Sequence, residues 1–416
     1  MHTSWPKDFL FGAATSAHQV EGGNHNDWTE WEHATAERKV ESAKGNPPAG
    51  GWPDYILKNY PNPLQPENYI SGIACDHYHR YEEDFNLAQG LDHNAHRFSI
   101  EWSRIEPEEG RFNEKEIEHY KNVAKAIRVR GMEPFVTLWH WTLPLWVRDK
   151  GGLMHPHFED LFARYSLMMA TALKNDVTFW MTLNEPNAFA KNAYLLGIWP
   201  PNRKSFLATG KAMKHLARAH IKSRRVIRHE IPHAQVGFGS AMRHFEPKRN
   251  NLLDRIAVRL AEFWSWDLFF MLARKKVDYI APQYYQRSKI AFPLSLSPGN
   301  GPQSDLGWEI YPQGLYELVK KLSRYKKPIY ITENGVADAR DAHREQFIRE
   351  HLAGVRKAIE EGVDIRGYFH WSLLDNFEWD KGFWPRFGLV EVDYKTLQRT
   401  IRPSALVYKK IIESGL

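Results

Sequence analysis

The sequence predicts an α/β fold in which eight parallel strands close into a barrel, and three observations support this prediction. Short apolar runs typical of buried strands alternate with longer segments whose apolar residues recur at spacings of three and four, as in amphipathic helices. Eight strand-like runs can be distinguished, which is the number that closes a parallel barrel. The 416 residues contain no internal repeat and no composition shift that would mark a domain boundary. We therefore expect a single (β/α)8 (TIM) barrel domain over residues 1–416.

The predicted elements follow one another along the whole chain. In chain order, the predicted strands cover Phe9–Thr15, Asn94–Ile100, Glu133–Trp139, Val177–Leu183, Gln235–Ser240, Asp278–Tyr285, Pro328–Thr332 and Asp364–Trp371. The amphipathic segments between them predict outer helices over Glu114–Arg130, Phe158–Lys174, Ser205–Arg228 and Arg344–Glu361. In such a barrel the carboxyl ends of all strands meet at one mouth, which long βα loops surround.

Two segments predict long loops at that mouth. Lys44–Pro66 contains six prolines and three glycines and follows the first strand. A loop there either shapes the substrate entrance or has no functional role, and the sequence leaves both open. Arg287–Gln303 carries three prolines and predicts a second such loop after the sixth strand.

Two of the predicted strands deliver a glutamate to the mouth. Glu185 follows the fourth strand in the segment MTLNEPN, and Glu333 follows the seventh in PIYITENG. Two acids at one site can hydrolyse a glycoside, because one protonates the leaving oxygen while the other attacks or stabilises the sugar cation. A buried ion pair or a helix cap is the alternative for each glutamate. Their matched positions at strand ends favour a joint catalytic role.

Aromatic residues are abundant, at 13% of the chain with 16 tryptophans. Aromatic faces stack on sugar rings, although any one tryptophan more often belongs to the core. The net charge of +6 is small for a surface of this size and does not indicate nucleic-acid binding. The basic segment Lys211–His229 is typical of a solvated helix face rather than of a membrane or partner surface.

Other features exclude several classes of protein. The single cysteine, Cys75, cannot form an internal disulfide or a cysteine-based metal site, which favours a reducing, cytoplasmic location. The histidines show no HExxH pattern, so we expect no metal. The first residues have too short an apolar run for a signal peptide, and no apolar stretch is long enough for a transmembrane helix.

Six motifs in order carry a resemblance to a known family. They are FLFGAATSAHQVEGG from Phe9, HRFSIEWSRIEP from His96, TLWHWTLPLW from Thr137, TLNEPN from Thr182, YITENG from Tyr330 and HWSLLDNFEW from His370. This set resembles the signatures of glycoside hydrolase family 1, which comprises β-glucosidases, β-galactosidases and their relatives. The resemblance covers essentially the whole chain.

The resemblance implies a retaining mechanism with Glu333 as the nucleophile and Glu185 as the general acid and then the general base. The family's matching arginine and tyrosine, here Arg97 and Tyr285, imply that Glu333 is kept ionised. Nearby negative charge and aromatic walls would keep Glu185 protonated until the nucleophile is consumed. The match also implies a contact from Asn184 to the sugar 2-hydroxyl, which strengthens in the transition state.

The same motifs imply a sugar-binding set. The matching positions that bind or border the sugar are Gln19, His140, Trp141, Trp371, Glu378 and Trp379. Three positions depart from the common pattern: Thr142 stands where many members have Asp, His96 where Tyr is usual, and Gln283 where Asn is common. Gln283 places in doubt the contact that this amide makes on the leaving-group side.

We expect a retaining β-glycosidase that removes terminal β-linked sugars from a small-molecule glycoside or oligosaccharide without a cofactor. β-D-Glucosides are the expected substrates, with β-galactosides or fucosides as alternatives. An endo-acting glycanase of a related family is the alternative enzyme, but Gln19, Glu21, Glu378 and Trp379 argue against it because they would close the sugar end. A catalytically silent sugar-binding barrel would normally lack one of the two glutamates. The sequence leaves homo-oligomer formation open.

Overall fold

The central feature of the fold is a closed ring of parallel strands. The computed structural model describes residues 5–48, 50–293 and 295–414. The main sheet has the order β5-β4-β3-β2-β1-β12-β11-β8-β6. Its two end strands, β5 (Gln235–Gly237) and β6 (Gly239–Ala241), are separated only by Phe238. The sheet therefore begins and ends on one segment, and the barrel closes with eight strand positions.

All eight predicted strands are confirmed, with the fifth divided into β5 and β6. The remaining barrel strands are β1 Leu10–Ala14, β2 Ala95–Ser99, β3 Glu133–Trp139, β4 Phe179–Leu183, β8 Ala281–Tyr284, β11 Ile329–Asn334 and β12 Ile365–Trp371. Every pairing between these strands is parallel. Their carboxyl ends therefore lie at one mouth.

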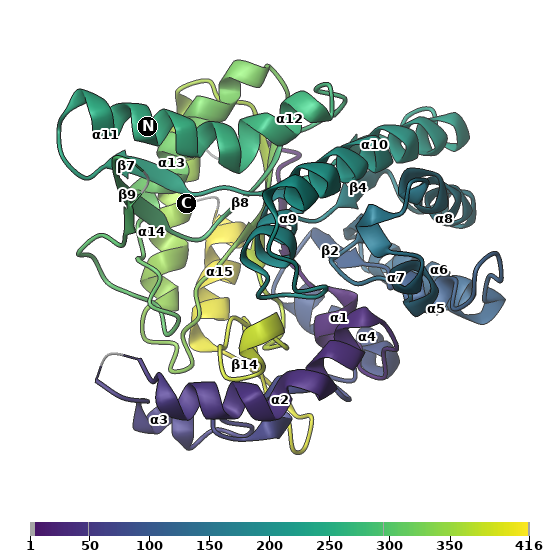
Figure 1. Cartoon of the computed structure of the whole chain (residues 1–416), viewed down its shortest axis with the longest axis horizontal. Coiled ribbons are helices and arrows are strands. Elements are labelled where there is room, and N and C mark those ends of the chain that lie inside the picture. The colour runs from purple at the N-terminus through teal and green to yellow at the C-terminus, as the bar shows by residue number, and fades with distance from the viewer. Residues whose placement is uncertain (1–4, 49, 294, 415–416) are drawn as a thin grey trace.

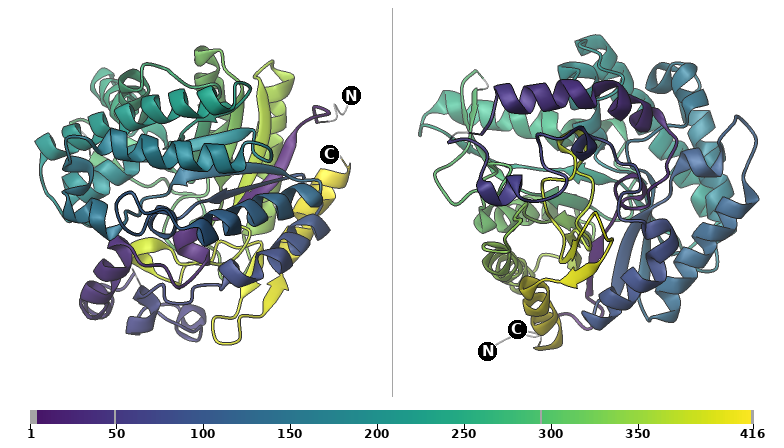
Figure 2. Two further views of the ribbon diagram at one scale, coloured as in Figure 1. Left: turned by 90° about the vertical axis from the view of Figure 1, so that its right-hand side faces the viewer. Right: turned by 90° about the horizontal axis from the view of Figure 1, so that it is seen from below.

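Helices surround the strands, as Figure 1 and Figure 2 show. The longer helices are α2 Asp27–Gly45, α4 His77–Gly90, α6 Glu114–Val129, α8 Phe158–Leu173, α10 Phe206–Glu230, α11 Leu252–Glu262, α13 Pro312–Leu322, α14 Arg344–Glu360 and α15 Pro403–Ser414. The predicted helices correspond to α6, α8, α10 and α14. Side chains fix two of their starts: Asn113 accepts from the Lys115 N–H at 3.1 Å, and Ser205 accepts from the Ala208 N–H at 3.2 Å. None of the helices within the described residues is long and apolar enough to cross a membrane.

Short helices lie mainly in the connections. The α-helical ones are α1 Ala17–Val20, α3 Asp54–Leu57, α5 Trp102–Ile105, α7 Leu145–Asp149, α9 Pro186–Ala190 and α12 Leu268–Leu272. The 3₁₀ or π turns are η1 Pro66–Tyr69, η2 Gly152–Met154, η3 Lys191–Leu196, η4 Phe263–Asp267, η5 Ser323–Tyr325 and η6 Trp379–Lys381. A small antiparallel pair joins β13 Val390–Val392 to β14 Arg399–Ile401.

Apolar packing divides into two layers. Inside the barrel lies a compact cluster that includes Phe135, Tyr279, Tyr330 and Phe369, all buried. The rings of Phe135 and Phe369 are 5.1 Å apart. The much larger cluster lies between the strands and the helices. Because the barrel interior is filled by side chains, a ligand can be held only above it, at the mouth.

The second predicted loop was wrong in part. Arg287–Gln303 contains β9 (Arg287–Ala291) and β10 (Ser295–Ser297), which form a three-stranded sheet with β7 (His244–Pro247). The prolines that suggested a loop, Pro293, Pro298 and Pro302, lie outside the strands, where they remove no ladder hydrogen bond. Residue 294 is outside the described residues. The first predicted loop, Lys44–Pro66, is irregular apart from the end of α2, the single turn α3 and the first residue of η1, with residue 49 outside the described residues.

Candidate active site

The two glutamates of the predicted pair line one cavity at the barrel mouth. Glu333 lies in β11 beside its last residue, and Glu185 lies two residues after the end of β4. Glu185 has a left-handed backbone, with φ 41°, which is uncommon for a residue other than glycine. Both side chains are buried, with exposures of 4% and 7%. The cavity has a volume of about 1080 Å³.

Glu333 is held by three donors. Arg97 Nη1 and Gln283 Nε2 donate to its Oε1 at 2.5 and 2.6 Å, and the Tyr285 hydroxyl donates to its Oε2 at 2.5 Å. Arg97 is fully buried in β2 and is oriented by a hydrogen bond to the Thr137 hydroxyl at 3.0 Å. Donors of this kind stabilise the ionised carboxylate.

Glu185 is in the opposite situation. Its carboxyl group has no hydrogen-bond partner among the described residues. Burial and the charge on Glu333 raise the pKa of Glu185 well above its ordinary value, while Arg97 and Arg243 lower it less. Burial also raises the pKa of Glu333, but the charge and hydrogen bond of Arg97 and the hydrogen bond of Tyr285 oppose that effect. A proton shared by this pair therefore belongs on Glu185.

Asn184 connects the charged end of the site to His140, which belongs to the expected sugar-binding set. Its Oδ1 accepts from Arg97 Nη2 at 2.6 Å and from Gln283 Nε2 at 2.8 Å. Its Nδ2 must then be the donor to His140 Nε2, at 2.9 Å. Burial, with the charge of Arg97, keeps the pKa of His140 well below its ordinary value, so the ring is neutral. This network fixes the orientation of Asn184 beside both glutamates.

Aromatic rings and a carboxyl group form the remaining wall of the cavity. Trp379 lies 4.7 Å from Trp141 and stacks on His140 at 5.8 Å, and His140 lies 6.1 Å from Trp371. The peptide bond after Trp371 is cis. Burial, with Asp380 and Glu333, raises the pKa of Glu378 to about 8.

Gln19 is fixed by its neighbours at this wall. Its Nε2 donates to Asn376 Oδ1 at 2.9 Å and to the Phe377 carbonyl at 2.8 Å, and Glu378 Oε2 is 3.5 Å away. Ten of the eleven predicted site residues line the cavity: Gln19, His140, Trp141, Asn184, Glu185, Tyr285, Glu333, Trp371, Glu378 and Trp379. The eleventh, Arg97, lies behind it.

Three other residues named from the sequence, Glu21, Thr142 and His96, lie outside the cavity lining. Glu21 does not line the cavity, because its carboxylate binds Arg104 at 3.0 Å and the Tyr120 hydroxyl at 2.8 Å. The Thr142 hydroxyl donates to Glu101 at 2.9 Å. His96 bonds the Thr15 hydroxyl at 3.2 Å.

Sequence reasoning named Gln283 only as a departure from the family pattern, and it did not name the cavity residues Lys191 and Arg243. Gln283 is paired in register with Glu333, so its amide supports the carboxylate. It lies two residues before Tyr285, and residues at that spacing share a face of a strand, so this contact could have been found. Arg243 and Lys191 line the same cavity as the two glutamates. Burial and Arg243 lower the pKa of Lys191 to about 8. Neither Lys191 nor Arg243 lies in a sequence motif that would identify it as a cavity residue.

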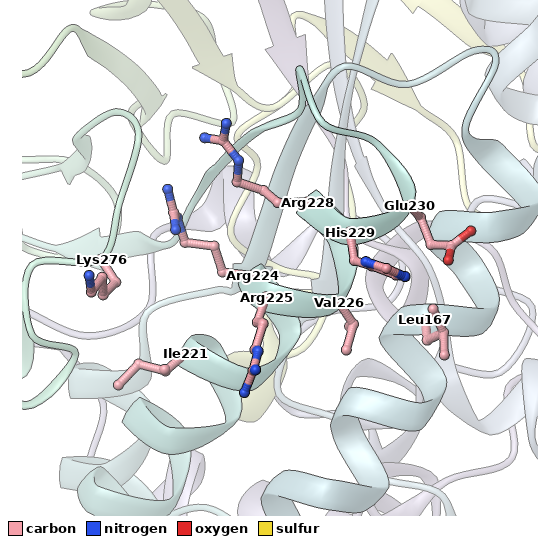
Figure 3. Close-up of a pocket in the computed structure, with 9 residues that line it drawn as sticks. All are labelled: Leu167, Ile221, Arg224, Arg225, Val226, Arg228, His229, Glu230 and Lys276. Carbon is pink, nitrogen blue, oxygen red and sulfur yellow. The ribbon is translucent and has the colours of Figure 1, made fainter.

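A second hollow lies beside the last turns of α10 (Figure 3). Arg224 and Arg228 both bind Asp278, at 2.5 and 3.2 Å, so much of its positive charge is compensated. Other basic residues of this helix, among them Lys211 and Arg225, face solvent, as expected for a solvated face. The two buried glutamates therefore remain the chemically distinctive feature.

The barrel and its two buried glutamates at the mouth indicate a glycoside hydrolase. Comparisons with known proteins identify the family. The profile of glycosyl hydrolase family 1 matches residues 1–292 and 273–415. The chain belongs to this family, whose members are retaining β-glycosidases.

Relatives resemble the chain over nearly its full length. Beta-glucosidase A of Thermotoga maritima is 32% identical, over 99% of this chain and 98% of the relative. The beta-galactosidase of Sulfolobus acidocaldarius is 30% identical, over 99% and 96%. The structure of the Thermotoga maritima beta-glucosidase with glucoimidazole covers 99% of both chains, with 30% identity and a TM-score of 0.86. The beta-glycosidase from Pyrococcus horikoshii covers 100% and 96%, with 35% identity and a TM-score of 0.87.

Proposed function

We propose that this protein removes terminal β-D-glucosyl residues from small glycosides by double displacement, with Glu333 as the nucleophile and Glu185 as the acid and base. One observation carries the proposal: two buried carboxyl groups share a cavity, and one accepts three hydrogen bonds while the other accepts none. This asymmetry sets one group as an ionised carboxylate and the other as an acid, as the first step requires.

In the first step a Glu333 oxygen attacks the anomeric carbon, and the bond to the leaving oxygen breaks. The electron pair of that bond goes to the leaving oxygen, which takes the proton of Glu185. Bond formation neutralises Glu333, so the charge that raised the pKa of Glu185 disappears. Glu185 then removes a proton from water, whose oxygen attacks the anomeric carbon and releases Glu333.

The buried network around these acids supports the transition state. Arg97 and Gln283 orient Asn184, which is placed to bind the sugar 2-hydroxyl as positive charge develops at the anomeric carbon. Tyr285 and Gln283 must weaken their hydrogen bonds to Glu333 as it becomes an ester. The tryptophans and Glu378 supply the stacking surface and the hydroxyl acceptor of the sugar end.

Hydrolysis of a chromogenic aryl β-D-glucoside tests this function, and a panel of aryl β-glycosides ranks the sugars. We expect the glucoside to be turned over, with galactoside and fucoside slower. Saturable binding of glucose with no turnover of any panel member would favour the sugar-binding barrel. Cleavage confined to internal bonds of long β-glucans would favour the endo-acting glycanase.

We infer that residues 1–416 act as one catalytic unit, because residues from both ends of the described chain, among them Gln19 in α1 and Trp371 in β12, line the same cavity. The single cysteine, Cys75, is buried, which supports a reducing, cytoplasmic location. That location stays a prediction, and cell fractionation tests it.

A further inference from the structure

Two positively charged side chains of the cavity, Lys191 and Arg243, form no ion pair with a carboxylate among the described residues. The one side-chain hydrogen bond of Arg243 runs to the Ser288 hydroxyl, at 3.5 Å. The other lysine of the cavity, Lys381, is instead paired with Asp380 at 2.9 Å. Lys191 is exposed and Arg243 is half-buried, so a ligand that enters the cavity can reach both. The two side chains therefore present uncompensated positive charge to that ligand.

The cavity also holds polar side chains with free hydrogen-bonding capacity. Asn192 and Gln286 line it, and neither amide makes a hydrogen bond within the described part of the chain. Lysine and arginine side chains contribute donors only. Donors therefore exceed acceptors among the unpaired groups of the lining, which suits a ligand group that consists of acceptor oxygens.

The segments that carry the two cations both adjoin Glu185. α9 begins directly after Glu185 and continues into η3, whose first residue is Lys191. Arg243 lies in the connection between β6 and β7. The Asn187 side chain joins this connection to α9, because its Nδ2 donates to the Ala241 carbonyl at 2.8 Å and its Oδ1 accepts from the Ala241 N–H at 3.3 Å.

The charges show the same association with one of the two acids. Lys191 and Arg243 repel each other, and each is attracted by Glu185. The positive charge that acts on Glu333 is instead that of Arg97. In the proposed reaction Glu185 delivers its proton to the leaving oxygen. Cations beside this acid, rather than beside the nucleophile, are placed to meet the leaving group.

We propose that Lys191 and Arg243 bind an anionic oxygen group of the aglycone, a carboxylate or a phosphate, so that the preferred substrates are β-glucosides of acidic aglycones. This inference rests on the proposed function and names the leaving group of that reaction. Glu185 does not neutralise the two cations while it holds its proton. The anion of the substrate supplies the missing negative charge, and the cations contribute binding and specificity.

The test compares matched aryl β-D-glucosides that carry a carboxymethyl, phosphonomethyl or carbamoylmethyl group at position 3 or 4 of the phenyl ring. The amide resembles the carboxylate in shape but has no charge, and the methylene keeps the leaving abilities of the phenols similar. We expect kcat/KM for an anionic member to exceed that for the amide about 10- to 100-fold, mainly through KM. The larger ratio identifies carboxylate or phosphate. Ratios near one for both anions at both ring positions would overturn the proposal.

Substitutions locate the effect. Lys191→Met and Arg243→Met should each lower the anion-to-amide ratio of kcat/KM about tenfold, whereas Lys191→Arg keeps the charge and should retain most of the ratio. Lys211→Met is the matched control, because it removes the same charge from an exposed position of α10 outside the cavity lining and should leave the ratio unchanged. An unchanged ratio in both methionine variants of the cavity would overturn the proposal.

The alternative role for these cations is to lower the pKa of Glu185, as the charge of Arg243 does. If that were their only role, Arg243→Met would move the fall of kcat/KM for the neutral amide to higher pH and leave the anion-to-amide ratio at its original value. That result would overturn the proposal, since the ratio reports the contact with the aglycone.

Failure of the inference and failure of the proposed function are distinguishable. Turnover of the amide with no preference for the anions leaves the function standing and overturns the anion site. Without any turnover, calorimetric binding of the same compounds decides: tighter binding of an anion than of the amide supports the site, and equal affinity overturns it. Because these comparisons use the unmodified protein, instability of a variant does not affect them.

Discussion

Glu333 and Glu185 differ in what surrounds them rather than in residue type. Glu333 accepts hydrogen bonds from Arg97, Gln283 and Tyr285, whereas the buried carboxyl of Glu185 accepts none within the described part of the chain. The proposed roles follow from this difference. The hydrogen-bond donors stabilise the ionised form of Glu333, which suits a nucleophile, whereas burial stabilises the protonated form of Glu185, which suits an acid.

Glu185→Ala tests the role of the acid. We expect hydrolysis of alkyl glucosides, which have poor leaving groups, to fall far more than that of activated aryl glucosides, which leave without a proton. Added azide should restore turnover of the activated substrates and yield a β-glucosyl azide. Steady-state rates and product analysis measure this. Equal losses for both substrate types would remove Glu185 from the role of acid.

Glu333→Gly should abolish turnover of all substrates, with a loss of at least about 10⁴-fold in kcat, because no covalent intermediate can form. Thermal denaturation serves as the control that the variant folds. Near-normal turnover in the folded variant would mean that another group is the nucleophile.

The coupling between the two acids gives a titration test. Since the charge on Glu333 raises the pKa of Glu185, Glu333→Gln should lower the pKa of Glu185 relative to the unmodified protein. Infrared or ¹³C NMR titration of the Glu185 carboxyl measures the shift. For the intact enzyme the sign is that kcat/KM falls as pH rises through the raised pKa, because the acid is lost. A higher Glu185 pKa in the variant would contradict the coupling.

Gln283→Leu isolates a positioning contribution. The substitution removes the donor to Glu333 Oε1 and Asn184 Oδ1 while keeping an apolar side chain of similar size. We expect kcat to fall about 10- to 100-fold with a smaller change in KM. The acid limb of the pH profile should move to higher pH, since loss of a donor raises the pKa of Glu333. An unaltered pH profile would show that Gln283 has only a packing role.

At the scale of elements, the strands were more predictable than the loops. Apolar runs identify strands because a parallel strand is covered on both faces. The segment over β9 and β10 was missed because its pairing with β7 depends on contacts distant in sequence. Two ion pairs hold it: Arg287 binds the buried Glu309 at 2.5 Å and the partly exposed Glu246 at 3.0 Å.

Glu309→Ala should therefore destabilise the protein by about 3 kcal/mol, because Arg287 loses a buried partner that also accepts from the Gly301 N–H at 2.8 Å. Glu108→Ala is the matched control: it removes an exposed pair with Arg111 and should cost at most about 1 kcal/mol. Chemical denaturation measures both free energies of unfolding. Similar values would show that the segment contributes little to the stability of the barrel.

The site was predictable where motifs carry it and where strand ends bring residues together. Glu185 and Glu333 follow from the apolar runs before them, and the motifs indicate the wall of Gln19, Glu378 and Trp379. Lys191 and Arg243 were not predictable. They lie in η3 and in the connection between β6 and β7, where the sequence has no regular apolar spacing that would indicate which side chains face the cavity. The expected place of Glu21 in the wall was wrong for a similar reason, since Arg104 holds it elsewhere.

For the whole molecule, closure of the barrel is what makes the chemistry feasible. β4 and β11 are distant in the sequence and not adjacent in the sheet, yet the closed ring brings Glu185 and Glu333 to one cavity. The tryptophans and Glu378 that we propose to hold the sugar line the same cavity, so a glycoside bound there presents its scissile bond to both acids. The proposed chemistry requires each acid to work from one side of that bond.

The stereochemistry of the product tests this central claim most directly. Two displacements at the anomeric carbon restore its configuration, whereas a single attack by water inverts it. Proton NMR of the earliest reaction mixture, recorded before mutarotation, should show the β-anomer of the released sugar. Initial appearance of the α-anomer would contradict double displacement and the assignment of Glu333 as the nucleophile.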